Sequence, residues 1–224
     1  YYRKAVESPQ PRLSDHIGLA LALYRQDKVA DAISLVEDLI KKGQGAPPLV
    51  RILISMLSSD KRTDEAERIA RMLIAESPTN VDSRLALTGV LIDQDRYDEA
   101  EAELVAAQSL AEGDEEMLLR VRYFLGIVYE EQGRGALALS VWRDNVAASG
   151  EHADSHNAIA YHFAEAGENL DEALRHILKA LENDPENPAY LDTLGWVYFK
   201  MGRAVEALDE LRKAAAKMPD PEIY

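Results

Sequence analysis

The stretch LDTLGWVYFKMGRAVEALDELRKAAAKMP, residues 191–219, decides the fold. Its apolar residues recur at intervals of three and four, the spacing that places them on one face of an α-helix. Gly202 interrupts this pattern, so the stretch predicts two helices joined by a tight turn. Gly195 in the first helix and Ala207 in the second are small, which lets the two helix backbones approach closely.

The same pattern recurs along the chain. Segments similar to the one around Ala207 include DEAL at residues 171–174 and DEAE at residues 98–101 and 64–67. The alanines at their centres are Ala32, Ala66, Ala100, Ala138, Ala173 and Ala207. These alanines are separated by 34, 34, 38, 35 and 34 residues, so the chain is an array of repeats.

The landmarks of the last repeat resemble those of the tetratricopeptide repeat (TPR) family. Leu191, Leu194, Gly195, Tyr198 and Ala207 match the pattern W-x2-L-G-x2-Y…A of that family, with Leu in place of Trp. The resemblance covers nearly the whole chain. It implies an all-α solenoid of about six helix-turn-helix repeats, stacked in a right-handed superhelix with a concave groove.

The period also predicts the limits of the repeats. We expect them at residues 13–46, 47–80, 81–114, 119–152, 153–187 and 188–221, with four extra residues at 115–118. Residues 1–12 read as the tail of a preceding repeat helix and a linker, and residues 222–224 as the start of a truncated next helix. We therefore expect a piece of a longer TPR protein, the alternative being that both ends are native.

The first helix of the last repeat has two apolar faces. At 100° per residue, Leu191, Leu194 and Tyr198 cluster on one side and belong to the packing set of the repeat. Trp196 and Phe199 lie roughly opposite. The resemblance implies that this second face lines the concave groove, where TPR proteins commonly hold peptide and protein ligands.

The same face of the last three repeats predicts a protein-binding surface. Its candidate contact residues are Arg120, Tyr123, Ile127, Asn157, Tyr161, Asp192, Trp196, Phe199 and Lys200. Aromatic rings flanked by arginine and asparagine are typical of binding hot spots. The alternative is that these rings are buried against the neighbouring repeat. The lysine, asparagine and arginine set with which one TPR subclass grips chaperone carboxylates is not found at these positions.

The composition argues against several other kinds of ligand. A net charge of −15 repels polyanions such as DNA and disfavours anionic membrane surfaces. No stretch approaches the roughly 18–20 apolar residues that span a bilayer. The chain has no cysteine, so it has no disulfide or thiolate site. We expect no nucleic acid partner and no membrane insertion by these residues.

The sequence contains few candidate reactive groups. His152 and His156 are four residues apart and could chelate a metal on one helix face, but no third ligand follows at a suitable spacing. Paired carboxylates such as Glu115 and Glu116 fall at expected helix ends, where acidic residues are favoured. No nucleophile, phosphate-binding or dinucleotide-binding motif occurs. We expect no catalytic residue, no cofactor and no metal.

The sequence therefore predicts a non-catalytic scaffold that binds a segment of another protein in its groove. The alternative is a structural module that forms a homo-oligomer through its open ends. Residues 157–223 are similar to the C-terminal repeats of bacterial TPR proteins, many of them cell-envelope lipoproteins. This resemblance implies a role in envelope assembly, secretion or proteolysis. It favours the bacterial periplasm or outer membrane, with the cytoplasm as the alternative location.

Overall fold

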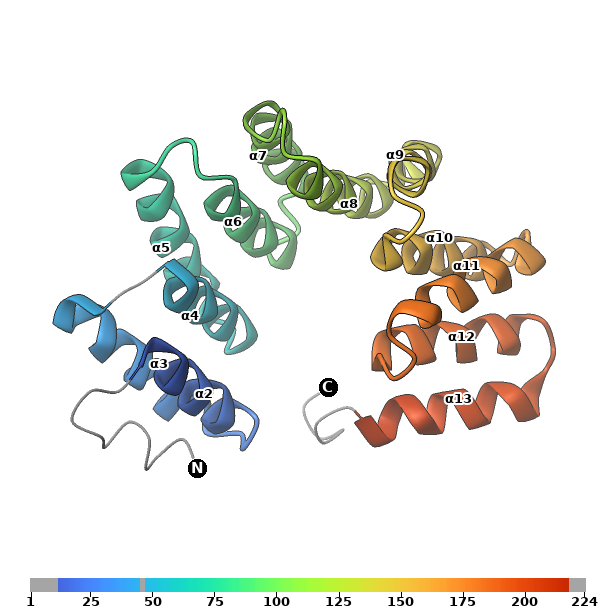
Figure 1. Ribbon diagram of the computed structural model, residues 1–224, viewed down its shortest axis with the longest axis horizontal. Helices are drawn as coiled ribbons and strands as arrows, with labels where there is room; N and C mark the ends of the chain where they lie inside the picture. The colour runs from blue at the N-terminus through green and yellow to red at the C-terminus, as the bar shows by residue number, and fades with distance from the viewer. Residues whose placement is uncertain (1–11, 45–46, 218–224) are drawn as a thin grey trace. The chain divides into compact units, whose positions relative to one another are not determined.

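The computed structural model describes residues 12–44 and 47–217, and this part is all-α (Figure 1). The helix tail expected at residues 1–12 lies outside it except for Arg12, as does the helix start expected at residues 222–224. The chain forms two compact units, Tyr1–Ala111 and Glu112–Tyr224. We call them the N-terminal unit and the C-terminal unit.

Each unit contains six of the twelve α-helices in the described ranges. The N-terminal unit holds α2 (Leu13–Tyr24), α3 (Val29–Leu39), α4 (Pro47–Ser59), α5 (Thr63–Glu76), α6 (Val81–Asp93) and α7 (Tyr97–Leu110). A π-helical segment, η1 (Ile40–Gln44), continues α3. The C-terminal unit holds α8 (Glu115–Glu131), α9 (Gly135–Ala148), α10 (Ala153–Ala166), α11 (Leu170–Asn183), α12 (Pro188–Lys200) and α13 (Ala204–Lys217).

The helices of each unit pack in consecutive pairs. In the C-terminal unit α8 packs on α9, α10 on α11, and α12 on α13, and in the N-terminal unit α2, α4 and α6 pack on α3, α5 and α7. Within the C-terminal unit the first helices of successive pairs also touch, since α10 contacts both α8 and α12. The expected all-α architecture of consecutive helix-turn-helix units is therefore confirmed.

Small residues bring the paired helices together, as the sequence predicts. All six repeated alanines are at most 3% exposed. A Cβ atom added to Gly195 would lie 2.6 Å from Cγ of Leu211 on α13, and one added to Gly126 would collide with the Trp142 indole of α9. Side chains at these two positions would push the partner helix away.

The turn inside each pair closes with the same hydrogen bond. A residue with positive φ follows each first helix, namely Asp27, Lys61, Asp95, Gly133, Gly167 and Gly202, and the α10–α11 turn also has Asn169 at positive φ. The N–H after each of the first six residues bonds back to the carbonyl five residues earlier, as from Arg62 to Leu57 at 2.8 Å and from Arg203 to Tyr198 at 2.9 Å. This is the Schellman closure, which satisfies carbonyls left free at a helix end.

Side-chain caps begin several of the first helices. Asn80, Asp114, His152 and Asn187 each accept a backbone N–H from the first turn of α6, α8, α10 and α12. A cap of this kind contributes about 1 kcal/mol. Residues 115–118, where the period predicts four extra residues, form the first turn of α8, which with 17 residues is longer than the other helices described.

Candidate protein-binding surface

A pocket of about 360 Å³ opens between the first helices of the C-terminal unit, α8, α10 and α12. Five of the nine candidate contact residues line it: Tyr123, Ile127, Asn157, Tyr161 and Asp192. The structure therefore brings residues from three successive repeats into one site.

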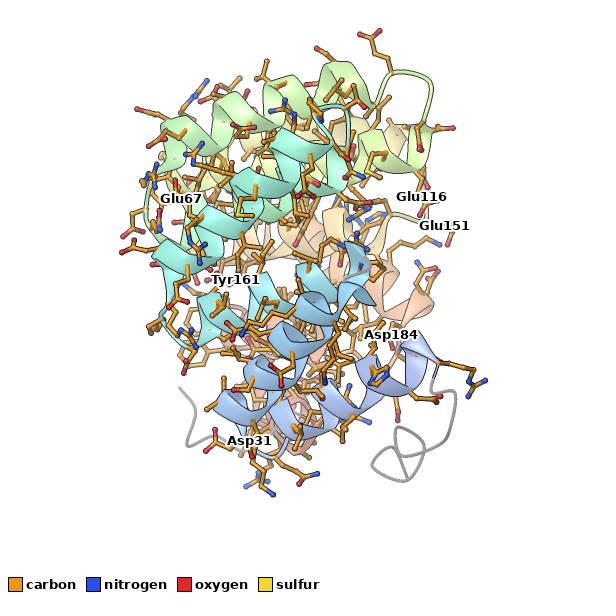
Figure 2. All side chains as sticks on the ribbon, turned by 90° about the vertical axis from the view of Figure 1, so that its left-hand side faces the viewer. Asp31, Glu67, Glu116, Glu151, Tyr161 and Asp184 are labelled. Carbon is orange, nitrogen blue, oxygen red and sulfur yellow. The ribbon has the colours of Figure 1, made fainter. Side chains whose placement is uncertain are left out.

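Helical spacing explains why these side chains meet. Tyr123 and Ile127 are four residues apart on α8, and Asn157 and Tyr161 are four residues apart on α10, so each pair lies on one helix face. Asp192 comes from α12, which packs on α10. Figure 2 labels Tyr161, which lies well inside α10, whereas Glu151 and Asp184 lie in the connections before α10 and α12.

Trp142, on the second helix α9 of its repeat, closes one side of the pocket. Its side chain on α9 is buried, and its Nε1–H donates a hydrogen bond to the Tyr123 carbonyl oxygen at 3.1 Å. The indole thus satisfies its polar atom while it fills the space above Gly126. This packing fixes the part of α8 that carries Tyr123.

The two tyrosines of the pocket differ in exposure. Tyr161 is 47% exposed, which is high for an aromatic side chain. Burial is the first cause that raises its pKa, followed by the negative charges of Glu165, Asp192 and Glu131. Tyr123 is more enclosed, and burial together with the charge of Asp154 raises its pKa to about 12. Both phenols are neutral at physiological pH.

A partly buried hydrogen bond holds α12 against α10 beside the pocket. The hydroxyl of Tyr190, at the start of α12, donates to Oδ1 of Asp154 at 2.6 Å. Tyr190 is only 6% exposed, and burial and this bond raise the pKa of its phenol. The bond joins two repeats and keeps their first helices in register at the site.

Three other candidate contact residues form a stack next to the pocket and do not line it. The Trp196 and Phe199 rings are nearly parallel, with centroids 5.2 Å apart. The Lys200 ammonium lies 4.7 Å from the centre of the Trp196 ring and donates to the Glu165 carbonyl oxygen at 3.3 Å. Trp196 also packs partly against the core, whereas Phe199 is 55% exposed.

Arg120 belongs to neither group. It is near the start of α8, and its guanidinium contacts the sulfur of Met117 at 3.6 Å. It is exposed and does not line the pocket. The structure therefore divides the nine candidates into five pocket residues, three residues of the adjacent stack and Arg120.

The pocket also includes residues outside the candidate set. Glu130 and Glu131 lie three and four residues after Ile127, so the helical period places them on the same face. His162 of α10 has its Nδ1 2.9 Å from both carboxylate oxygens of Glu130. These two residues are 32 positions apart, and no spacing within one repeat would have shown the contact.

His152 and His156 do not converge on a common point. Nδ1 of His152 accepts the Ser155 N–H, while Nδ1 of His156 lies 2.7 Å from Nδ1 of His176. Nε2 of His156 is 3.2 Å from the Gly150 carbonyl, to which it must donate. Within residues 12–44 and 47–217, no group of three or more metal-ligating side chains occurs. None of the helices described there is long and apolar enough to cross a membrane.

Comparison with known proteins assigns the family. Two family models, both described as tetratricopeptide repeat, match the chain. One matches residues 17–81, 123–188 and 157–221, and the other matches residues 57–120. The chain belongs to the tetratricopeptide repeat family. The TPR resemblance expected from the alanine spacing is thereby confirmed.

Individual TPR proteins are similar to parts or all of the chain. It is 28% identical to the TPR repeat-containing protein PA4667 of Pseudomonas aeruginosa over 164 residues, and it spans only 27% of that relative. The thermophilic TPR protein TTC0263 of Thermus thermophilus superposes with a TM-score of 0.66 at 19% identity, over 87% of this chain and 98% of that one. PilW, a type IV pilus biogenesis factor, gives 0.65 at 19% identity, over 93% and 94%. These two likenesses show the shared fold.

Proposed function

We propose that this TPR protein is a non-catalytic scaffold that binds a segment of a partner protein on the first-helix face of its C-terminal unit. TPR repeats are in general protein-interaction modules. The observation that carries the proposal is the pocket between α8, α10 and α12, to which three repeats contribute the predicted contact residues. A concave site with a few convergent polar groups is the expected form of a ligand site.

The aromatic side chains of this face support binding rather than a purely structural role. Tyr161 and Phe199 are 47% and 55% exposed. Large aromatic rings held on rigid helices lose little conformational entropy when a ligand covers them, and they dominate the energetics of many interfaces. The stack of Trp196, Phe199 and Lys200 extends the same surface along α12 beyond the pocket.

The process that the scaffold serves is proposed to be bacterial envelope assembly, secretion or proteolysis. The similarity of residues 157–223 to repeats of bacterial envelope proteins supports this assignment, as does a relative from a bacterium. The chain would then act as an adaptor that presents one protein to another.

The binding face can be tested with a single exposed residue. Protein would be immobilised as the parent chain and as Tyr161→Ala, and bacterial lysate passed over both. Removing a hot-spot tyrosine costs about 2 kcal/mol, or roughly a thirtyfold loss of affinity. We expect quantitative mass spectrometry to show at least one protein that the parent retains and Tyr161→Ala loses.

The matched control is Leu178→Ala on the second helix α11. The side chain of Leu178 is 45% exposed, nearly the same fraction as the 47% of Tyr161, but it does not line the pocket. This variant should retain the same proteins as the parent. If Tyr161→Ala and Leu178→Ala retain identical sets of proteins, the pocket is not the binding site and the proposed function is wrong.

A further inference from the structure

The pocket between α8, α10 and α12 is lined by negative charge. Its lining contains three carboxylates, Glu130, Glu131 and Asp192, and no lysine or arginine. Glu130 is engaged by His162, whose Nδ1 lies 2.9 Å from both of its carboxylate oxygens. Glu131 and Asp192 are exposed and come from helices two repeats apart. They leave two negative charges facing a ligand.

The field of these carboxylates converges on one ring. The pKa of the Tyr161 phenol is raised first by burial and then by Glu165, Asp192 and Glu131, which come from three different helices. Their combined effect on one hydroxyl indicates that negative charge surrounds the centre of the site. An anionic ligand would be repelled there, whereas a cation would be attracted.

One further polar group of the pocket is an acceptor without a donor. Oδ1 of Asn157 is buried and has no hydrogen-bond partner in the part of the chain that the structure describes. A buried acceptor without a partner costs free energy that a donor on a ligand would recover. This observation is independent of the carboxylates and points to the same kind of ligand.

The aromatic rings complete a cation site. The faces of tyrosine rings attract ammonium and guanidinium groups, and Tyr123 and Tyr161 both line the pocket. The neighbouring stack contains an example within this chain, since Lys200 places its ammonium 4.7 Å from the Trp196 ring centre and donates to a carbonyl of α10. A lysine is therefore already held by a ring and an oxygen acceptor on this face.

We propose that the pocket receives the side chain of a lysine or arginine from the bound segment, with Glu131 and Asp192 as its charged contacts and Tyr161 as its aromatic contact. The inference rests on the proposed function, because it specifies the chemistry of the segment that the C-terminal unit binds. A volume of about 360 Å³ is small for a ligand site, and it suits one long side chain rather than a folded element.

The test uses peptides of known sequence. A library of random dodecapeptides displayed on phage would be selected on the parent protein, on Glu131→Gln/Asp192→Asn and on a control, Asp144→Asn/Asp209→Asn. The control carboxylates are exposed on the second helices α9 and α13 and do not line the pocket, so both double variants change the net charge equally. We expect the parent and the control to select peptides with a shared lysine or arginine, and the pocket variant to lose this preference.

The positive charge of the basic residue would then be removed while its shape is kept nearly the same. A selected peptide would be synthesised with arginine or with citrulline, which is neutral and nearly isosteric, or with lysine or norleucine. We expect the neutral peptide to bind the parent and the control about tenfold more weakly in fluorescence anisotropy, and to bind the pocket variant with less than about a twofold difference. Because the comparison of peptides on the parent needs no variant, a misfolded variant would not remove the test.

The outcomes separate the two proposals. Each selected peptide would also be measured on Tyr161→Ala. Peptides that bind Tyr161→Ala more weakly but tolerate citrulline or norleucine would overturn the basic side chain and leave the proposed function in place. A tenfold effect of citrulline that persists in Glu131→Gln/Asp192→Asn would also overturn the inference, because the cation would be bound elsewhere. Selection of no peptide that depends on Tyr161 would contradict the proposed function itself.

Discussion

The N-terminal and C-terminal units build the same turn from different residues. In the C-terminal unit the positive-φ residue that precedes the closing N–H is glycine, at Gly133, Gly167 and Gly202, and the α10–α11 turn adds Asn169 with φ 48°. In the N-terminal unit the corresponding residue is Asp27, Lys61 or Asp95, with φ between 56° and 60°. The left-handed conformation costs an L-residue about 1–2 kcal/mol, and glycine avoids that cost. The repeat therefore imposes its backbone even where the local residue opposes it.

The stabilising contacts of the two units differ as well. In the N-terminal unit Arg96 of the α6–α7 turn bridges Glu67 at 2.6 Å and Glu99 at 2.7 Å, all at least partly exposed. In the C-terminal unit the packing centres on large buried aromatic residues, Trp142 and Tyr190. The unit with glycine turns and an aromatic interior is therefore the one suited to carry a preorganised binding site.

The largest expected effect comes from removing the indole at the base of the pocket. Trp142→Ala should lower the free energy of unfolding of the C-terminal unit by about 3–5 kcal/mol, because a buried aromatic residue leaves a cavity. Both tryptophans of the chain, Trp142 and Trp196, lie in this unit, so Trp196 emission during urea unfolding reports on it alone.

The matching change in the N-terminal unit is Leu104→Ala. Leu104 is fully buried and occupies the same repeat position, four residues after the central alanine. Its loss should destabilise that unit by about 2–5 kcal/mol, seen as faster amide exchange within residues 12–111, with the tryptophan transition unchanged. A cost below about 1 kcal/mol for Trp142→Ala would contradict the view that the indole organises the C-terminal unit.

The second expected effect is a difference between the units in acid. When both rings are neutral, His156 donates through Nε2 to Gly150 and its Nδ1 accepts the proton of His176. Burial lowers the pKa of His156 and lowers that of His176 from 6.5 to about 4. As the pH falls, the unfolded chain binds protons at these histidines before the folded chain does. Their contribution to the free energy of unfolding is therefore fully present above pH 6.5 and is lost as the pH falls toward 4. For His176 this loss is about 3 kcal/mol.

The N-terminal unit should respond at lower pH. Its only histidine is His16, and the hydrogen bonds from Arg96 lower the pKa values of Glu67 and Glu99 below 4.5. Stability from such carboxylates is present above their ordinary pKa and is lost below it. Lowering the pH from 7 to 5 should therefore lower the urea midpoint of the transition that tryptophan emission reports. The urea midpoint of the N-terminal unit should stay unchanged over this range. His176→Gln should flatten this dependence, and an unchanged slope in that variant would contradict the assignment.

Much of the fold could be predicted from the sequence because it depends on spacing along the chain. The alanine period locates the helix pairs, and Gly195 and Ala207 mark their close contact. The turn conformation at Lys61 could not be predicted in this way, because nothing in a lysine favours positive φ. Only its register, 34 residues before Asp95, aligns it with the other turns.

The site could be predicted only in part, for a related reason. One helical period places Tyr123, Ile127, Asn157, Tyr161 and Asp192 on a common face, and the structure brings them to one pocket. The helical period cannot show contacts between helices of successive repeats, such as that of His162 with Glu130. Nor can it show that Trp196 turns to Phe199 and Lys200 instead of lining the pocket, because this depends on the packing of α12 on α10.

The smallest expected effect tests the turn comparison directly by exchanging its residues. Lys61 is exposed, and its N–H donates to the Ser58 carbonyl at 3.0 Å, a bond that glycine would keep. Lys61→Gly should stabilise the N-terminal unit by about 0.5–1 kcal/mol, because relief of left-handed strain exceeds the added freedom of the unfolded chain. Gly202→Lys should destabilise the C-terminal unit by about 1–2 kcal/mol. Amide exchange in residues 12–111 and tryptophan emission would read the two units separately. If Lys61→Gly destabilises its unit, the lysine makes a contribution that outweighs its backbone strain, and the difference between the units is not one of turn strain.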